Sequence, residues 1–246
     1  MNARSTTTFK RPTPKRDASV AGNVFTRLVE ALVTGALPAG SPLREAQVAK
    51  QWGVSRTPMR EAVRRAAEAG LLTLRKNRTP LIRAFTLHDV DCLYQLREMM
   101  EVLAMKQAWH RLTEKEIGAL KSMASSVGST QSRKWVSRCL AFDEALHKIW
   151  FDHCQNPWLT RLLQSSRVFI RIFQHAMARY PALVQKSYDQ HLAILDALGT
   201  PDLPLGIQLL RKHIRDSAIQ VKWHMHRTRP LSRRTDARSP RQIAGA

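Results

Sequence analysis

The chain has few acidic residues and no long hydrophobic run. Its 246 residues include 19 Asp and Glu against 40 Lys and Arg, which gives a formal charge of +21. A field of this sign attracts polyanions, so nucleic acid and anionic membrane surfaces are both candidate partners. No run of about 18 apolar residues could cross a bilayer, and the start lacks the apolar segment of a secretory signal. We therefore expect a cytoplasmic protein with no membrane partner.

Cysteine is scarce as well, at three residues in the chain. Cys92, Cys139 and Cys154 are widely spaced and odd in number, whereas small secreted domains carry even sets of closely spaced cysteines. We expect reduced, mostly packed thiols rather than a disulfide framework, with redox sensing as the lesser alternative.

Length and charge distribution divide the chain into parts. A chain of 246 residues can hold two modest domains, each with its own core. Residues 1–85 carry 16 basic and 5 acidic side chains, whereas residues 86–228 carry 19 and 13. The two ends have too few apolar residues to repay the entropy of ordering. The predicted parts are a disordered basic tail over 1–19, a first domain over 20–85, a second over 86–228, and a disordered basic tail over 229–246.

Residues 48–83 contain the elements of a helix-turn-helix followed by a wing. A short helix ends at Gly53, where a left-handed residue would let two helices meet at a steep angle. The next helix begins just before Pro58, because proline is tolerated only in the first turn of a helix. Ser55 or Thr57 can cap the exposed amides of that turn. The start of the second helix is therefore predicted to within a residue or two.

This second helix has one apolar face and one basic face. Arg56, Arg60 and Arg64 recur at every fourth residue on the basic face. For an arbitrary basic helix a solvated face is the better interpretation, but the preceding turn favours a helix that enters a DNA groove. The apolar face is predicted to consist of Met59, Val63, Ala66, Ala67 and Gly70.

The flanking segments complete a three-helix unit with a β-hairpin. Two apolar stripes upstream predict two helices, one through Val24, Leu28, Leu32 and Val33 and one through Leu43, Val48, Ala49 and Trp52. Downstream, residues 71–74 and 81–85 read as short strands around a charged turn over 75–80. We therefore predict a winged helix-turn-helix.

The segment GVSRTPMREAV, followed by AGLLTLRKNRTPLIRAF, resembles the amino-terminal DNA-binding domain of the GntR family of bacterial transcription regulators. The resemblance implies that Arg56 and Arg60 reach bases or phosphates from the start of the recognition helix. It also implies that Thr57 binds a phosphate and that the wing tip, Asn77 and Arg78, approaches the minor groove.

Two departures from the family pattern affect this surface. The wing glycine is replaced by Thr79-Pro80, which alters the close approach of backbone at that point. Ala46 stands where some relatives carry a DNA-contacting arginine, and Arg44 nearby is the candidate substitute. Ser55, at the start of the recognition helix, completes the candidate DNA-binding residues.

From residue 86 onward the pattern is almost entirely helical, with no strand-like alternation. Short breaks at Thr113, Asn156-Pro157 and Pro181 separate the helices. We predict an all-α antiparallel helical bundle, so the whole chain is mainly α. The predicted helices span residues 87–111, 113–127, 131–154, 157–178, 181–198 and 203–227.

Inside the bundle, polar residues recur on apolar helix faces. Asp143 and His147 are four residues apart in FDEALHKIW, so on a helix they lie one turn apart and can share an ion. The same face continues through Cys139, Leu140, Leu146 and Trp150, which predicts that the pair points inward. His191 and His213 lie in similar apolar surroundings, in QHLAILDAL and LLRKHI.

Taken singly, each histidine is better interpreted as a hydrogen-bonded core residue. Burying three imidazoles and a carboxylate without a common partner would, however, cost several kcal/mol. A shared divalent cation accounts for Asp143, His147, His191 and His213 together. This ligand set suits zinc, nickel, manganese or iron and leaves positions open in an octahedral site.

The second half resembles the FCD ligand-binding domain of the FadR-like GntR subfamily, and the combined resemblance spans roughly residues 20–225. The resemblance implies metal binding by Asp143, His147, His191 and His213. The family's Asn-Pro-x-Leu segment is present as residues 156–159, and Asn156 is taken as a candidate effector-binding residue.

Arg97 lies one turn before Glu101 in LREMMEVLA. The simpler interpretation is a surface ion pair, which would contribute only about 0–1 kcal/mol. Relatives commonly have an arginine here that faces the metal pocket, and a guanidinium grips a carboxylate through two parallel hydrogen bonds. We favour Arg97 as the anchor of a small carboxylic acid effector.

Two functions follow from these features. The first is a homodimeric transcriptional regulator, most simply a repressor, that binds a palindromic operator in double-stranded DNA and responds to a carboxylate at a divalent metal. The second is a metalloenzyme that uses the Asp-His-His-His site, with the basic domain serving only to hold it on nucleic acid. No separate general base stands out for the enzyme, so we favour the regulator.

Overall fold

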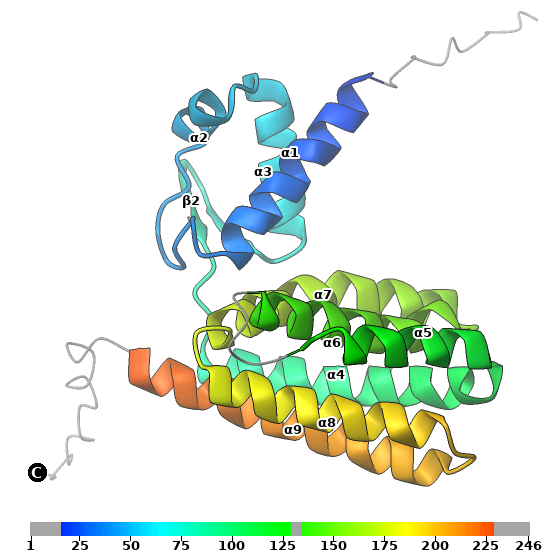
Figure 1. Cartoon of the computed structure of the whole chain (residues 1–246). Coiled ribbons are helices and arrows are strands. Elements are labelled where there is room, and N and C mark those ends of the chain that lie inside the picture. Colours follow the sequence, from blue (N-terminus) through cyan, green and yellow to red (C-terminus); the bar gives the residue numbers. More distant parts are fainter. Residues whose placement is uncertain (1–15, 129–133, 229–246) are drawn as a thin grey trace, which may run out of the picture. The chain divides into compact units, whose positions relative to one another are not determined.

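The computed structural model describes residues 16–128 and 134–228. Contacts divide the chain into two units between Ala84 and Phe85, one residue before the predicted boundary (Figure 1). The first helix begins at Arg16. Residues 16–19, which were predicted to belong to the disordered tail, are therefore helical. The rest of the two predicted tails lies outside the described residues.

From residue 16 onward, the first unit contains three helices and a two-stranded antiparallel sheet. Most residues of the predicted apolar stripes form its core, in which Leu28 and Met59 are almost fully buried. Ala67 and Gly70, which were predicted on the apolar face of the second helix, are only half-buried, and Gly70 lies beyond the end of that helix. Trp52 is only half-buried, and the guanidinium of Arg27 lies 4.6 Å from the centre of its ring. The elements are α1 (Arg16–Val33), α2 (Glu45–Trp52), α3 (Arg56–Glu68), β1 (Leu72–Arg75) and β2 (Arg78–Ile82).

The turn between α2 and α3 has the predicted backbone. Gly53 is left-handed, with φ 66°, and its amide bonds to the carbonyl of Lys50 at 3.2 Å. Ser55 is the N-cap residue of α3, but its side chain makes no capping hydrogen bond. The predicted cap is therefore present in backbone geometry only.

The wing hairpin is tighter than predicted. The turn is Lys76-Asn77, and Asn77 adopts a positive φ of 54°, a conformation that asparagine tolerates. Residues 78–80, which we expected in the turn, belong to β2. Pro80 fits there because the pairing of the two strands is irregular opposite it, so its missing N–H costs no regular ladder bond. Its carbonyl accepts a hydrogen bond from the amide of Leu43 at 2.8 Å.

The second unit is the predicted helical bundle, and its described residues form no strand. Helix α4 packs against α6, α7 and α9, and α8 packs against α5, α6 and α9 (Figure 1). The predicted helix over 131–154 begins at Trp135, and the one over 87–111 ends in a 3-10 turn. The helices are α4 (Leu87–Ala108), η1 (Trp109–Arg111), α5 (Glu114–Ser125), α6 (Trp135–Asp152), α7 (Pro157–Met177), α8 (Pro181–Leu198) and α9 (Leu203–Thr228).

Two helices of the bundle start with a capping box. Thr113 accepts a hydrogen bond from the amide of Glu116 at 3.3 Å, and the Glu116 carboxylate accepts from the Thr113 amide at 3.0 Å. Thr86 and Asp89 do the same at the start of α4. These reciprocal bonds satisfy amides that a helix start leaves exposed.

All three cysteines lie in the described part and are free thiols. Cys139 is buried and Cys154 is half-buried, but Cys92 is exposed, so the expectation of packed thiols fails at that position. No helix among residues 16–128 and 134–228 has the length and apolar character needed to span a membrane.

Candidate metal centre and nucleic-acid surface

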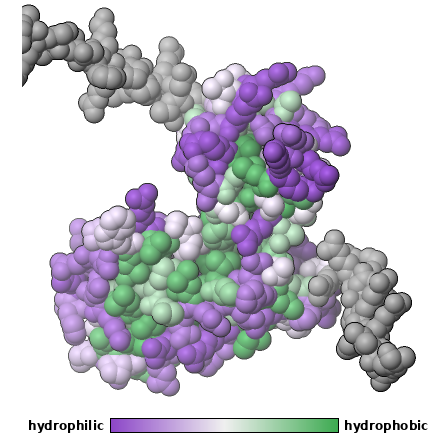
Figure 2. Space-filling view, turned by 180° about the vertical axis from the view of Figure 1, so that it is seen from behind, coloured by the Kyte–Doolittle hydropathy of each residue, from purple (hydrophilic) through white to green (hydrophobic). Residues whose placement is uncertain are grey.

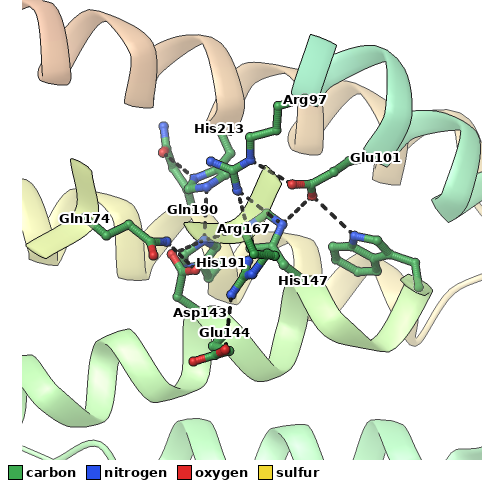
Figure 3. Close-up of polar contacts among 11 residues, drawn as sticks. Arg97, Glu101, Asp143, Glu144, His147, Arg167, Gln174, Gln190, His191 and His213 are labelled. Carbon is green, nitrogen blue, oxygen red and sulfur yellow. Dashed lines mark hydrogen bonds and ion pairs between the residues drawn. The ribbon is translucent and has the colours of Figure 1, made fainter. Parts of the chain in front are cut away.

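Three helices bring the four predicted ligands together. Asp143 and His147 lie one turn apart on α6, His191 comes from α8, and His213 comes from α9. All four side chains are buried, and one donor atom of each lies within 4.8 Å of the others. Figure 3 shows them converging between the helices. The predicted cluster is therefore present in the fold.

The Nε2 atom of His191 lies at the centre of this cluster. It is 3.3 Å from Nε2 of His147, 3.1 Å from Nε2 of His213 and 3.3 Å from Oδ2 of Asp143. Three ring nitrogens and a carboxylate oxygen thus face one another in a volume that is closed to solvent.

Two of the imidazoles are oriented by hydrogen-bond partners at Nδ1, the ring nitrogen that faces away from the cluster centre. Nδ1 of His147 lies 2.5 Å from Oε2 of Glu101, and Nδ1 of His213 lies 3.2 Å from Oε1 of Gln190. An ionised carboxylate or an amide oxygen only accepts, so each Nδ1 carries the proton and each Nε2 keeps its lone pair for the centre. Orientation of metal-bound histidines by such partners is a general feature of metal sites.

The protonation states agree with this geometry. Burial lowers the pKa of His191 to about 4 against the opposing field of Asp143, and burial also lowers the pKa of His213. Burial by itself raises the pKa of the Asp143 carboxyl, but the fields of His191 and His147 outweigh it and hold this pKa below its ordinary value.

The cluster therefore gathers imidazole nitrogens and one carboxylate in a buried space, with the guanidinium of Arg97 at its edge. Mutually facing acceptors in a buried site are unfavourable unless a cation lies between them. Nitrogen and oxygen donors of this kind suit the divalent first-row metals. The residues present thus fit a metal ion.

Arg97 and Glu101 form a buried pair, so the simpler interpretation of a surface pair is wrong. Their side chains are 3% and 2% exposed, and Nε of Arg97 donates to Oε1 of Glu101 at 2.7 Å. The Nη2 atom of Arg97 lies 3.2 Å from Nε2 of His147. Arg97 therefore faces the cluster, as the family resemblance implied (Figure 3).

Sequence reasoning missed three residues that support the cluster. Glu101 accepts from Nδ1 of His147 and from Nε1 of Trp150, the latter at 3.3 Å. Nε2 of Gln174 on α7 donates to Oδ1 of Asp143 at 2.6 Å, and Gln190 faces His213. The only sequence signals were the four-residue spacing of Glu101 from Arg97 and the position of Gln190 beside His191.

A small cavity adjoins the cluster, with a volume of about 50 Å³. Its lining includes Arg97, Asp143, His191 and His213. Asn156 is not part of it. The Asn156 side chain instead caps α7, where its Oδ1 accepts from the amide of Leu159 at 3.1 Å. Asn156 therefore has a structural role as the N-cap of α7, away from the cavity in which an effector is expected.

The candidate DNA-binding residues are all exposed in the first unit. They lie at the start of α2, at the start of α3 and at the hairpin tip, and comprise Arg44, Ser55, Arg56, Thr57, Arg60, Asn77 and Arg78. Arg64, the third basic residue of α3, forms ion pairs with Glu61 and Glu68. The remaining positive charge of α3 lies on Arg56 and Arg60 in its first two turns and on Arg65, whose guanidinium lies 4.2 Å from the ring centre of Phe25.

A winged helix-turn-helix unit followed by a helical unit with a buried polar centre defines the class of DNA-binding regulators that carry a sensory domain. Residues 20–81 match the family described as bacterial regulatory proteins, gntR family, and residues 92–216 match the FCD domain. The chain therefore belongs to the GntR family and carries an FCD domain.

Relatives and solved structures agree with this assignment. The chain is 27% identical over 199 residues to the "Probable D-xylose utilization operon transcriptional repressor" of Paenarthrobacter nicotinovorans, covering 80% of this chain and 86% of that one. It is 30% identical over 160 residues to the Nta operon transcriptional regulator of Aminobacter aminovorans, covering 65% and 74%. The solved structure of E. coli McbR/YncC has the same fold, with a TM-score of 0.71 at 19% identity over 83% of this chain and 97% of that one.

These matches identify a DNA-binding transcriptional regulator and not an enzyme. The metalloenzyme alternative is accordingly set aside.

Proposed function

We propose that this regulator is a homodimeric repressor whose affinity for a palindromic operator is set by a divalent metal and a small carboxylic acid bound in the helical unit. The observation that carries the proposal is the convergence of four buried donor atoms within 4.8 Å. The repressor assignment is supported by the name of the relative from Paenarthrobacter nicotinovorans.

The metal would be held by Asp143, His147, His191 and His213. Zinc, nickel, manganese and iron all accept three imidazoles and one carboxylate. When bound, the ion supplies positive charge and open coordination positions to which a carboxylate can bind. Arg97 adds a guanidinium at the edge of the same cluster, 3.2 Å from Nε2 of His147, and can grip the effector carboxylate through two hydrogen bonds. Charge in the site therefore favours an acidic effector.

Operator recognition would rest on α3 and the wing. Arg56 and Arg60 project from the first two turns of α3 and can reach guanine edges or phosphates in the major groove. Thr57, Ser55 and Arg44 at the start of α2 would contact phosphates. Asn77 in the turn and Arg78 at the start of β2 are exposed at this end of the hairpin, which would approach the minor groove. Positive charge at all three places supports binding to the DNA backbone.

The homodimer is supported by an apolar stripe on the helical unit. Leu96, Met99 and Leu103 follow one another at helical spacing on α4, and each is exposed, with Met99 at 72%. Ile219 on α9, the helix packed beside α4, is 62% exposed. Figure 2 shows apolar residues gathered on a face of this unit. Exposed apolar surface of this kind is typical of a protein interface. A twofold dimer would also match the symmetry of a palindrome.

Helix α4 offers a covalent route between sensing and DNA binding. It carries Arg97 and Glu101, which contact the metal cluster, and it begins at Leu87, shortly after β2 ends at Ile82. A ligand shifts such an equilibrium only by its difference in affinity for the two states. An effector that engages Arg97 would favour one position of α4 and so change the placement of the two DNA-reading units in the dimer.

The test uses the full chain and an operator selected from random DNA. Protein loaded with zinc should contain about one ion per chain by elemental analysis, and small carboxylic acids should change its operator affinity in a mobility-shift assay. His191→Ala should lose the ion and the response to acids. His175→Ala, an exposed histidine on α7, is the matched control and should keep both. Equal zinc content in His191→Ala and the unchanged protein would refute the metal site. A monomer on the operator, seen by light scattering, would refute the dimer.

A further inference from the structure

A buried amide donor lies in the wall of the cavity beside the metal cluster. The Nε2 atom of Gln220 on α9 is shielded from solvent and has no hydrogen-bond partner within residues 16–128 and 134–228. Gln220 lines the same cavity as Arg97, Asp143 and His213. A buried donor without an acceptor costs free energy, so each one in a folded protein calls for an explanation. A ligand that brings an acceptor into the cavity supplies one.

Arg167 shows that not every such donor points to a ligand. Its two terminal nitrogens also lack a hydrogen bond among the described residues, but Nη2 lies 3.9 Å from a carboxylate oxygen of Glu144. The guanidinium also lies 6.0 Å from the ring centre of Phe151. Arg167 does not line the cavity, whereas Gln220 does.

The position of Gln220 along α9 defines the shape of the space. His213, Ser217 and Gln220 follow at helical spacing and all line the cavity, so they lie on one face of the helix. Seven residues at 1.5 Å each place Gln220 about 10 Å along the axis from His213. The cavity therefore has a charged end at the metal cluster and a neutral polar end at Gln220.

The cavity lining also includes apolar side chains, although Gln174, Ser187 and Ser217 line it too. Met177 at the end of α7, Leu183 and Val184 on α8, and Val221 on α9 all line it. Arg97 is the cation among the described residues that line the cavity, and it lies at the metal end. The Gln220 amide is neutral, so a second carboxylate at that end would be buried without a countercharge, which is costly.

We propose that the effector is an elongated monocarboxylate that carries a neutral hydrogen-bond acceptor, such as a carbonyl, at the end opposite its carboxylate, where Gln220 donates to it. This inference rests on the proposed function, because it takes the metal and Arg97 as the carboxylate end. Gln220 is then the residue that selects among acids. A chain of roughly six carbons spans the distance that the helix sets.

The cavity volume implies that binding enlarges this space. A cavity of about 150 Å³ can hold benzene, and the space here is about 50 Å³. A six-carbon acid therefore requires the cavity wall to move. Met177 lies in this wall at the end of α7, and its flexible side chain can change position. A ligand that fits only the enlarged cavity binds that state more tightly. This difference in affinity is what shifts the protein from one state to the other.

Three acids of similar length test the proposal on the zinc-loaded full chain: hexanoate, 5-oxohexanoate and adipate. Isothermal titration gives their affinities for the unchanged protein, Gln220→Leu and the matched control Gln208→Leu, an exposed glutamine on the same helix. Gln220→Met, which is unbranched like glutamine, serves if the leucine variant folds poorly. Side-chain amide resonances from ¹⁵N-labelled protein, with that of Gln220 assigned by its loss in Gln220→Leu, report the contact directly.

We expect 5-oxohexanoate to bind the unchanged protein about tenfold tighter than hexanoate, the gain of one satisfied buried hydrogen bond. Adipate should bind more weakly than 5-oxohexanoate. Gln220→Leu should abolish the preference while keeping hexanoate affinity, Gln208→Leu should keep the preference, and the Gln220 amide resonance should shift with 5-oxohexanoate only. Hexanoate and 5-oxohexanoate binding equally, with no effect of Gln220→Leu, would overturn this inference and leave the carboxylate sensor standing. No binding of any acid to the zinc-loaded protein would overturn the proposed function as well.

Discussion

Replacing Glu101 with glutamine tests whether this buried carboxylate supports the affinity of the proposed metal site. The Glu101 carboxylate is 2% exposed and accepts from Nε of Arg97 at 2.7 Å, from Nδ1 of His147 at 2.5 Å and from Nε1 of Trp150 at 3.3 Å. Glutamine keeps the shape but removes the charge, and it turns one of the two oxygens into a donor. That donor would face Arg97 or the Nδ1 proton of His147, both of which are donors themselves.

Two magnitudes follow from these contacts. The substitution leaves the buried guanidinium of Arg97 without its carboxylate, which lowers the free energy of unfolding by about 3–5 kcal/mol. For a domain of this size that corresponds to a fall of roughly 6–20 °C in melting temperature. Loss of the carboxylate behind His147 also lowers the basicity of the ligand nitrogen, and zinc affinity should fall about 10-fold to 100-fold.

The assay separates the two effects. Zinc affinity is measured by competition with a chromophoric chelator below the melting temperature of the variant, and stability by calorimetry with and without zinc. The matched control is Glu98→Gln on the same helix, whose carboxylate bonds to Arg215 at 2.8 Å near the surface and should change both quantities little. If Glu101→Gln melts earlier but binds zinc within twofold of the unchanged protein, Glu101 only neutralises Arg97, and the reasoning about ligand orientation is refuted.

Three further predictions concern the rest of the chain. Arg60→Ala should weaken specific operator binding by about 1–3 kcal/mol if Arg60 contacts a guanine edge. Arg64→Ala should have little effect, because the charge of Arg64 is paired with Glu61 and Glu68. Mobility-shift assays on the selected operator compare the two variants. Gly206→Ala would place a Cβ 2.4 Å from two ring carbons of Trp109, so denaturant unfolding should show a loss of about 1–3 kcal/mol, and unchanged stability would contradict the packing. Hydrogen bonds, led by one from the Thr113 backbone, lower the pKa of Glu116 from 4.5 to about 2, so its contribution is complete above pH 4.5 and is lost as pH falls toward 2. The melting temperature of Glu116→Gln should therefore fall less steeply over that range, and parallel curves would argue against it.

In the DNA-binding unit, the sequence predicted correctly the positions at which glycine and proline restrict the backbone. Gly53 is left-handed as expected, and Pro58 falls in the first turn of α3. The wing was misjudged because Pro80 was read as part of a turn. Its place in β2 depends on irregular pairing with β1 and on the amide of Leu43, which are tertiary contacts that the hairpin sequence does not encode.

The cluster of Asp143, His147, His191 and His213 could be predicted because each of these residues breaks an apolar helical pattern. Asp143 and His147 do so at a spacing that joins them on one turn, and His191 and His213 do so singly. The supporting residues could not be predicted in this way. Whether Glu101 faces solvent or the cluster depends on which side of α4 meets α6, and this follows from the packing of the whole bundle.

Helix α4 departs from the usual burial of residue types in two ways. It buries two charged side chains, Arg97 and Glu101, and exposes three apolar ones, Leu96, Met99 and Leu103. Each arrangement is unfavourable for an isolated helix in water, because a buried charge needs a partner and an exposed apolar stripe needs a cover. The buried Arg97 and Glu101 pair with each other, and Glu101 also pairs with His147. The exposed stripe would be covered in the proposed dimer. One helix would thus be stabilised by the sensing site on one side and by the second protomer on the other. A change at the cluster that moves α4 would therefore also move the dimer contact, which is the mechanical connection that a ligand-controlled operator-binding dimer requires.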